Sequence, residues 1–312
     1  MISRASSLRY FAALPLAGAS VGRASAQRAV LRVGSVPADP FAEAYFAQEM
    51  GFFSKAGLDV EITSFSNGAG SATAIAGGAL DIGISTVTMM ANAALHGVPL
   101  VYIAGGALYD DRAPSAVLCV AKNSTIAAPK DFEGKAIAVG GIRDGTHLGA
   151  AAYLTKNGVD LTKVNFIEMP FPTMAAALKR GAVAGAIIAE PFVTASADDV
   201  RVFALAEGAV APRFMAGGWF ALQAWVDANR DVARRFTAVI YQTARWANAN
   251  RARSGEILQK YSKIDQATLD HMTRSVFSES LTPAMIDPIL QWASRLKFTD
   301  RLVSAKEMID RP

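Results

Sequence analysis

The chain has 312 residues, of which 52% are hydrophobic and 19% are charged, and its formal net charge at pH 7 is +4. The first 26 residues hold three basic residues and no acidic ones, so the remainder has 28 Lys and Arg against 27 Asp and Glu, a net charge of +1. This balance, without a basic run or a basic patch interleaved with aromatic residues, argues against a nucleic-acid partner. The length suits one or two domains with a full core.

The first 26 residues have the pattern of a secretory signal peptide. Arg4 and Arg9 form a basic start, Tyr10–Val21 is apolar, and Ala24-Ser25-Ala26 is a small-residue cleavage site. The apolar stretch is well below the ~20 residues of a membrane span. We therefore expect cleavage after Ala26 and an exported, soluble protein. An apolar N-terminal helix of a cytosolic protein is the alternative.

Short strands and helices alternate from Ala29 onward. Strands are expected at Ala29–Val36, Leu58–Ile62, Ala79–Ile84, Pro99–Ala104, Ser115–Ala121, Ala136–Val139, Val164–Glu168 and Gly217–Gln223. Asp39 is expected to cap a helix that has Pro40 in its first position and runs to Gly51. Further helices are expected at Ser85–His96, Leu148–Lys156 and Asp227–Asn250. This alternation predicts a parallel α/β sheet.

A glycine turn, Gly140-Gly141, joins the strand at 136–139 to a helix that opens near Thr146. The backbone N–H groups and the partial positive charge of a helix start can hold an anion, and Arg143 adds a full charge nearby. The alternative is an ordinary strand-to-helix turn capped by Asp144 or Thr146.

The pattern of a small-residue helix, a glycine stop and an apolar strand occurs twice. Gly78-Ala79-Leu80 aligns with Gly181-Ala182-Val183, and Ile84 aligns with Ile187, at a spacing of about 103 residues. We interpret this as two similar α/β halves. Crevices at strand ends of such sheets are where ligands bind. The last third of the chain, from Ala216, has no glycine-rich ligand turn and is interpreted as packing.

Several segments together resemble one family. They are the signal peptide, GFFSKAGLDVEI (Gly51–Ile62), GGALDIGIS (Gly77–Ser85) and AEPF (Ala189–Phe192). They resemble the bacterial periplasmic substrate-binding proteins of ABC importers for nitrate, aliphatic sulfonates, taurine and thiamine pyrimidine precursors. The resemblance implies a periplasmic solute-binding component with an α/β, two-lobed type II fold. Lobe one would be 28–117 and 218–312, lobe two 118–217, with two crossing hinge strands near Cys119 and Trp219.

The resemblance also implies a ligand site on loops between the lobes. The candidate residues are Pro37, Phe41, Ser66, Asn67, Gly68, Ser85, Thr86, Arg143, Gly145, Thr146, Phe171, Glu190 and Trp219. We expect the accepting end of the ligand at the Gly145 and Thr146 amides, with Arg143 nearby. An aromatic side chain such as Phe41 would cover its middle.

Glu190 is expected to accept hydrogen bonds from the donor end of the ligand. The alternative is that Glu190 pairs with a cation of lobe two and never meets the ligand. Asp39 could also face Glu190 across the cleft, which keeps general acid–base catalysis open as a minority interpretation.

An enzyme is the main rival class. Eukaryotic relatives that make a thiamine pyrimidine carry a cysteine cluster, whereas Cys119 is the only cysteine here. The histidines lack metal-type spacing: His96, His147 and His271. We expect a monomeric binding protein with a small-molecule ligand, ABC permease partners in the inner membrane, no cofactor and no metal. A thiamine-pyrimidine synthesis-type enzyme and a sensor that presents its ligand to a receptor are the alternatives.

Overall fold

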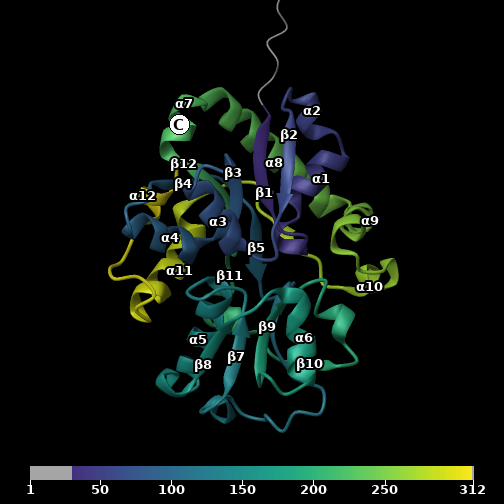
Figure 1. Cartoon of the computed structure of the whole chain (residues 1–312), viewed down its shortest axis with the longest axis vertical. Helices are drawn as coiled ribbons and strands as arrows, with labels where there is room; N and C mark the ends of the chain where they lie inside the picture. Colours follow the sequence, from purple (N-terminus) through teal and green to yellow (C-terminus); the bar gives the residue numbers. More distant parts are fainter. Residues whose placement is uncertain (1–29, 311–312) are drawn as a thin grey trace, which may run out of the picture.

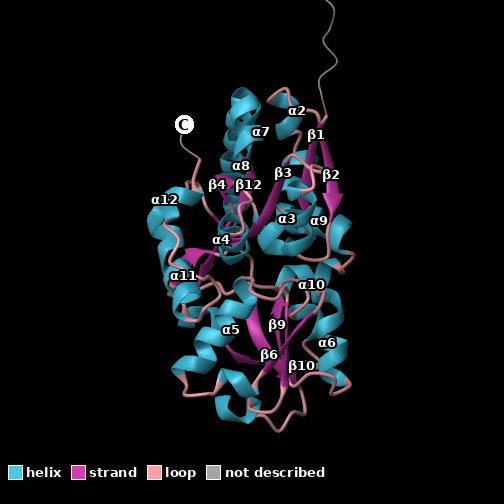
Figure 2. Ribbon diagram, turned by 60° about the vertical axis from the view of Figure 1, so that its left-hand side comes forward, coloured by secondary structure: helices cyan, strands magenta, loops and turns pink. Residues whose placement is uncertain are grey.

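The structure is a computed structural model that describes residues 30–310, so the predicted signal peptide at 1–26 lies outside the described residues. Two five-stranded sheets stand one above the other along the long axis, the first in the upper half of Figure 1 and the second in the lower half. Helices pack around both sheets (Figure 2). Within residues 30–310, no helix combines the length and the apolar character that a membrane span requires.

Five strands form the first sheet: β1 (Leu31–Ser35), β2 (Val60–Ser64), β3 (Ile82–Thr86), β4 (Leu100–Gly105) and β12 (Gly217–Leu222). Their order is β2-β1-β3-β12-β4, with β1 parallel to β2 and β3, and β12 antiparallel to both of its neighbours. The connections hold a 3-10 turn, η1 (Asp39–Phe41), and the helices α1 (Glu43–Glu49), α2 (Phe52–Lys55), α3 (Gly68–Ala76) and α4 (Val87–Leu95). This sheet with its helices is the first lobe.

The second lobe is built on β6 (Ala116–Ala121), β7 (Ala136–Val139), β8 (Asn165–Glu168), β9 (Gly185–Ala189) and β10 (Val200–Ala204). The order is β10-β6-β9-β7-β8, with β7 parallel to β8 and β9, and β6 antiparallel to β9 and β10. Its helices and 3-10 turns are α5 (Gly145–Lys156), α6 (Phe171–Lys179), η2 (Pro129–Phe132), η3 (Leu161–Lys163), η4 (Thr194–Ser196) and η5 (Ala206–Ala209).

The two sheets repeat one topology, because β1, β2, β3, β12 and β4 occupy the places of β7, β8, β9, β6 and β10. The glycine stops have equivalent roles in the two lobes. Gly78 follows α3 with φ +72° and Gly181 follows α6 with φ +69°, a backbone conformation that favours glycine. The predicted internal repeat and the two-lobed α/β fold are confirmed, but the sheets are mixed rather than parallel, because β12 and β6 run antiparallel to their neighbours.

The chain crosses between the lobes through β5 (Ala107–Asp110) and β11 (Arg213–Met215), which pair antiparallel with each other. A short strand, β13 (Val276–Phe277), pairs with β5 on its other side. The crossing strands were expected near Cys119 and Trp219, but Cys119 lies within β6 and Trp219 within β12. Both are fully buried inside a sheet, so the crossings that the resemblance implied lie a few residues away, in β5 and β11.

The C-terminal part packs mainly against the first lobe. Its helices are α7 (Gln223–Ala228), α8 (Arg230–Ala249), α9 (Arg251–Ser262), α10 (Gln266–His271), α11 (Pro283–Arg295) and α12 (Ala305–Met308). Phe236 and Ile240 of α8 are fully buried, and the Phe236 ring stacks on Phe53 of α2 at a centroid distance of 5.7 Å. The predicted amphipathic helix is thus confirmed.

Two predicted helix starts are wrong. Asp39 lies in η1 and its side chain caps no helix there; α1 begins at Glu43. Ser85 and Thr86 end the strand β3, so α4 begins at Val87. In both places the local pattern of a cap residue is overridden by partners from elsewhere in the fold.

Candidate functional site

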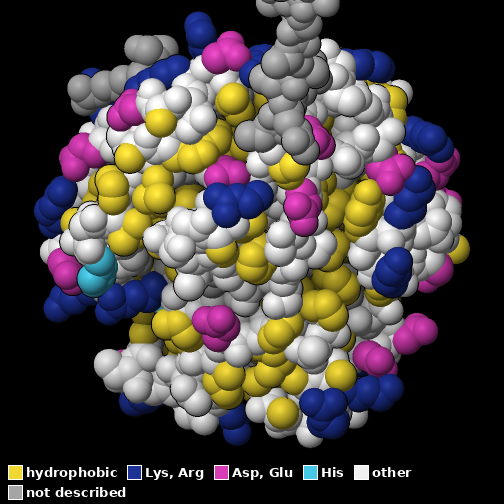
Figure 3. All heavy atoms as spheres, turned by 45° about the horizontal axis from the view of Figure 1, so that its top comes forward, with side chains coloured by type: hydrophobic (Ala, Val, Ile, Leu, Met, Phe, Trp, Pro, Cys, Tyr) yellow, Lys and Arg dark blue, Asp and Glu magenta, His cyan; other side chains and the backbone are white. Residues whose placement is uncertain are grey.

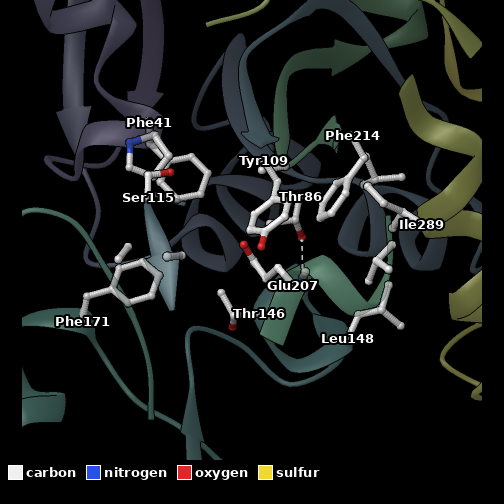
Figure 4. A pocket seen from close by; sticks show the side chains of 17 residues that line it. Phe41, Thr86, Tyr109, Ser115, Thr146, Leu148, Phe171, Glu207, Phe214 and Ile289 are labelled. Carbon is white, nitrogen blue, oxygen red and sulfur yellow. Dashed lines mark hydrogen bonds between the residues drawn. The ribbon is translucent and has the colours of Figure 1, made fainter. Parts of the chain in front are cut away.

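A cavity of about 30 Å³ lies between the lobes, beside the crossing strands (Figure 4). The first lobe contributes Phe41 and Thr86 to its walls, and the second lobe contributes Thr146 and Phe171. Tyr109 enters from the crossing strand β5. A volume of this size holds little more than a water molecule, so a larger ligand requires the lobes to move apart.

The cavity walls are mainly apolar. Phe41 and Phe171 lie on one side in Figure 4, and Phe214, Leu148 and Ile289 lie on the other. Polar side chains stand between these two apolar groups. Aromatic walls around a few polar groups are typical of small-molecule sites.

A direct hydrogen bond joins the lobes at the cavity. The Gly145 backbone N–H, at the start of α5, donates to the Thr86 hydroxyl of the first lobe at 3.2 Å, the dashed line in Figure 4. This contact closes one side of the cavity, so separating the lobes breaks it.

The helix start that was predicted to bind an anion uses its donors internally. The Asp144 carboxylate caps α5 by accepting from the His147 N–H at 2.9 Å and from the Thr146 hydroxyl at 2.7 Å. The Thr146 hydroxyl in turn accepts from the Gly140 N–H at 2.8 Å. The structure therefore shows the alternative, a turn capped by Asp144. Burial raises the pKa of Asp144 to about 7, although its hydrogen bonds act in the opposite direction.

Arg143 does not enter the cavity. Its side chain is exposed, its backbone has φ +62°, and its N–H donates to Nδ1 of His147 at 3.0 Å. The His147 ring contacts Phe166 of the second lobe and Phe298 of the first, at centroid distances of 4.1 and 4.5 Å. Burial, with the Arg143 charge, lowers the pKa of His147 to about 4, so this ring is neutral at pH 7.

Glu190 lies beside the cavity rather than in its walls. Its carboxylate accepts from the N–H and the hydroxyl of Thr194 at 3.0 and 2.8 Å and from the Thr273 N–H at 3.4 Å. Burial raises its pKa. The described residues provide no cation for Glu190, so its partners differ from both expectations. A ligand contact of Glu190 stays a prediction.

Asp39 turns away from the cavity as well. Its fully buried carboxylate pairs with the Arg274 guanidinium at 2.9 Å and accepts from the Ser275 N–H at 2.6 Å. Its own backbone N–H donates to the carbonyl of Glu190 at 3.0 Å. The two carboxylates that an acid–base mechanism would need are thus bound by separate partners.

Some of the thirteen predicted site residues line the cavity and the rest do not. Five of the thirteen line it: Phe41, Thr86, Gly145, Thr146 and Phe171. Eight do not: Pro37, Ser66, Asn67, Gly68, Ser85, Arg143, Glu190 and Trp219. Trp219 is buried in the first lobe and donates from Nε1 to Glu43 at 2.8 Å, and Asn67 caps α3.

Sequence reasoning missed the carboxylate that the cavity does contain. Glu207 of η5 points into it with 6% of its surface exposed, and no hydrogen-bond partner for its side chain occurs in residues 30–310 (Figure 4). Burial, and then the charge of Asp144, raises the pKa of Glu207 to about 8. The only available signal was one acidic residue within the apolar stretch 202–211.

A glycine allows this placement. A Cβ on Gly149 of α5 would lie 2.6 Å from Cγ of Glu207, so only glycine lets η5 and α5 approach this closely. Among the residues that the structure describes, no group of three His, Cys, Asp or Glu side chains is placed to hold a metal ion.

Comparisons with known proteins agree with this architecture. Residues 39–253 match a family model described as NMT1/THI5 like. The taurine-binding periplasmic protein of Escherichia coli (strain K12) is 31% identical over 199 residues, which cover 63% of this chain and 58% of that protein. The match thus spans less than two thirds of this relative.

Solved structures share the fold at low sequence identity. The alkanesulfonate-binding protein SsuA from Xanthomonas axonopodis pv. citri, bound to MOPS, superposes with a TM-score of 0.78 at 19% identity, covering 92% of this chain and 100% of that one. The periplasmic nitrate-binding protein NrtA from Synechocystis PCC 6803 gives 0.74 at 16% identity, covering 90% and 84%.

Proposed function

The chain belongs to the NMT1/THI5-like family, and we propose that it is the periplasmic solute-binding component of an ABC importer. It captures a small organic ligand between its lobes and delivers it, as a monomer, to permease subunits in the inner membrane. The taurine-binding relative and the two-lobed fold support this function. The predicted signal peptide at 1–26 supports export to the periplasm.

The observation that carries the proposal is a cavity whose walls come from both lobes and which the interlobe hydrogen bond between Gly145 and Thr86 helps to close. Two antiparallel crossing strands, β5 and β11, suit closure by a hinge. A ligand that touches both lobes stabilises the closed form, because it binds that form better than the open one.

Binding without turnover is part of the proposal. Cys119 is buried in β6, and burial followed by the charge of Glu190 raises its pKa to about 12, so its thiol is a poor nucleophile at pH 7. On the face in Figure 3, charged side chains of both signs are interspersed, which suits a soluble carrier.

The test uses the mature chain, residues 27–312. A thermal-shift screen against sulfonates, carboxylates, nitrate, pyrimidines and amines identifies a ligand, which at 100 times its dissociation constant adds ~2.7 kcal/mol of stability. Small-angle scattering then measures compaction with that ligand, and mass spectrometry follows the ligand over time. We expect compaction and an unchanged ligand. Chemical conversion of the ligand contradicts the binding role, and binding without compaction contradicts closure.

A further inference from the structure

The cavity contains a carboxyl group without a partner. Glu207 is more than nine-tenths buried and points between the lobes, yet no hydrogen bond or ion pair satisfies its side chain in residues 30–310. A buried polar group without a partner is costly, and native structures retain one mainly where it has a function. The fold holds this group in place through the close contact of η5 with Gly149.

Two polar groups near Glu207 favour a donor or a positive charge. Behind it lies Asp144, whose charge acts on Glu207. The Tyr109 hydroxyl, which Figure 4 shows near the Glu207 carboxyl, donates its proton to Asp111 at 2.8 Å, so its oxygen is left to accept. The Thr86 hydroxyl accepts from the Gly145 N–H and lies 3.3 Å from the Thr88 hydroxyl, so it already has two partners.

The cavity walls contain no Lys, Arg or His among the described residues. Two neighbouring carboxyl groups without a cation favour a ligand that brings positive charge, because ionisation of Glu207 beside Asp144 is costly where water is excluded. The helix donors that would have favoured an oxyanion are used by Asp144 and Thr86.

We infer that the ligand is an organic cation, a protonated amine or amidine on an apolar body, and that Glu207 binds its charged end. This inference rests on the proposed function. An ammonium group offers three donors, which match the Glu207 carboxylate and the Tyr109 oxygen. The apolar body lies between Phe41 and Phe171 on one side and Phe214 on the other. Aromatic faces next to a carboxylate attract organic cations.

The experiment is calorimetric titration of the mature chain with probes that differ in charge. Benzylamine is compared with benzyl alcohol and benzenesulfonate, and taurine is compared with ethanesulfonate. We expect benzylamine to bind more tightly than its neutral and anionic counterparts, and taurine to bind more tightly than ethanesulfonate.

Two matched variants test the residue. Glu207→Gln should weaken amine binding about 10- to 100-fold, the loss of a hydrogen bond to a charged group. Glu43→Gln makes the same change at a fully buried glutamate of the first lobe, outside the cavity, and should leave the affinity unchanged. Glu207→Asp keeps the carboxylate but moves it back from the cavity by one methylene, so it should give an intermediate affinity. Circular dichroism checks that each variant folds.

Each other result is decisive. Amine affinity that is equal in the wild type and in Glu207→Gln overturns the inference. So does binding of benzenesulfonate or ethanesulfonate in preference to the amines, although that result supports the proposed carrier function. Failure of both amines to bind also overturns the inference, and the proposed function is then decided by the wider screen and the scattering measurement.

Discussion

The loops after the equivalent strands β1 and β7 each carry a buried aspartate, and the surroundings of this residue differ between the lobes. In the first lobe Asp39 follows β1, is fully buried and pairs with Arg274 at 2.9 Å. In the second lobe Asp144 follows β7, is almost as buried, and has amide and hydroxyl partners but no cation among residues 30–310. The same residue type at equivalent places in the repeat thus has its charge balanced in one lobe only.

This difference gives the interlobe cavity its polarity. The first lobe presents aromatic and hydroxyl groups to it, whereas the second lobe places Asp144 and Glu207 beside one another. The charge of each carboxyl group disfavours ionisation of the other unless a cation arrives. Both the proposed ligand class and the predictions below depend on this asymmetry.

The largest effect is expected from removing the cation that balances Asp39. Arg274→Met leaves a fully buried carboxylate unpaired, so we expect a loss of about 3–5 kcal/mol in the free energy of unfolding, measured by urea denaturation. The control is Arg301→Met, which removes an exposed partner of Glu307 and should cost about 0–1 kcal/mol. Equal, small losses in both variants would mean that Asp39 needs no cation.

The second prediction concerns the packing that holds Glu207. Gly149→Ala places a Cβ at 2.6 Å from Cγ of Glu207, so we expect a loss of about 1–3 kcal/mol in the free energy of unfolding and weaker ligand binding. Gly77→Ala is the control, because a Cβ there meets its nearest neighbour at an ordinary 3.5 Å. Unchanged stability and affinity in Gly149→Ala would show that η5 moves freely against α5.

The third prediction is a stability that falls as the pH rises. Burial raises the pKa of Glu207 to about 8 and that of Asp144 to about 7, so the folded state binds more protons than the unfolded state between about pH 4 and pH 8. Unfolding then releases protons, and the free energy of unfolding decreases by at most about 1.4 kcal/mol per pH unit for each group. Glu43, whose pKa burial also raises to about 8, adds to this slope.

Glu207→Gln separates the contributions in denaturation curves measured from pH 5 to pH 8. The variant should have a shallower slope than the wild type, because one proton-binding group is gone. A slope identical to that of the wild type would show that Glu207 ionises in the folded state as freely as it does in water.

The sequence predicted well what depends on local pattern. The glycine stops at Gly78 and Gly181 and the apolar strands after them revealed the repeat, because turn conformation and strand burial are encoded within a few residues. The cap of α5 by Asp144 was one of two alternatives for the same reason. The equivalent expectation for Asp39 was wrong, since its partner Arg274 lies 235 residues away.

The site was predicted only in part. Thr86, the last residue of β3, and Phe171, shortly after β8, line the cavity, and both were predicted because the ligand loops of the resembled family match there. Glu207 was missed because nothing near it in the sequence announces a ligand residue; its burial comes from contact with α5 at Gly149. Trp219 and Glu190 were expected in the site, but the wall of a cavity depends on how two lobes meet, which a local pattern does not record.

The smallest expected effect tests the hydrogen bond between Gly145 and Thr86, which joins the lobes at the wall of the cavity. Thr86→Val keeps the shape of the side chain and removes the hydroxyl that accepts from the Gly145 N–H at 3.2 Å. The closed form loses this bond, whereas the open form exposes the same N–H to water. We therefore expect closure to become less favourable by about 0.5–1.5 kcal/mol, the net value of one such bond.

Two readouts should change together in Thr86→Val. Ligand affinity should fall by the same free energy, because binding requires the closed form, and scattering should show a larger radius at subsaturating ligand. Thr237→Val is the control, since its hydroxyl donates to the Ile103 carbonyl within the first lobe and its loss should change stability without changing closure. If Thr86→Val binds and closes like the wild type, the Gly145 contact follows from the meeting of the lobes and does not help to hold them together.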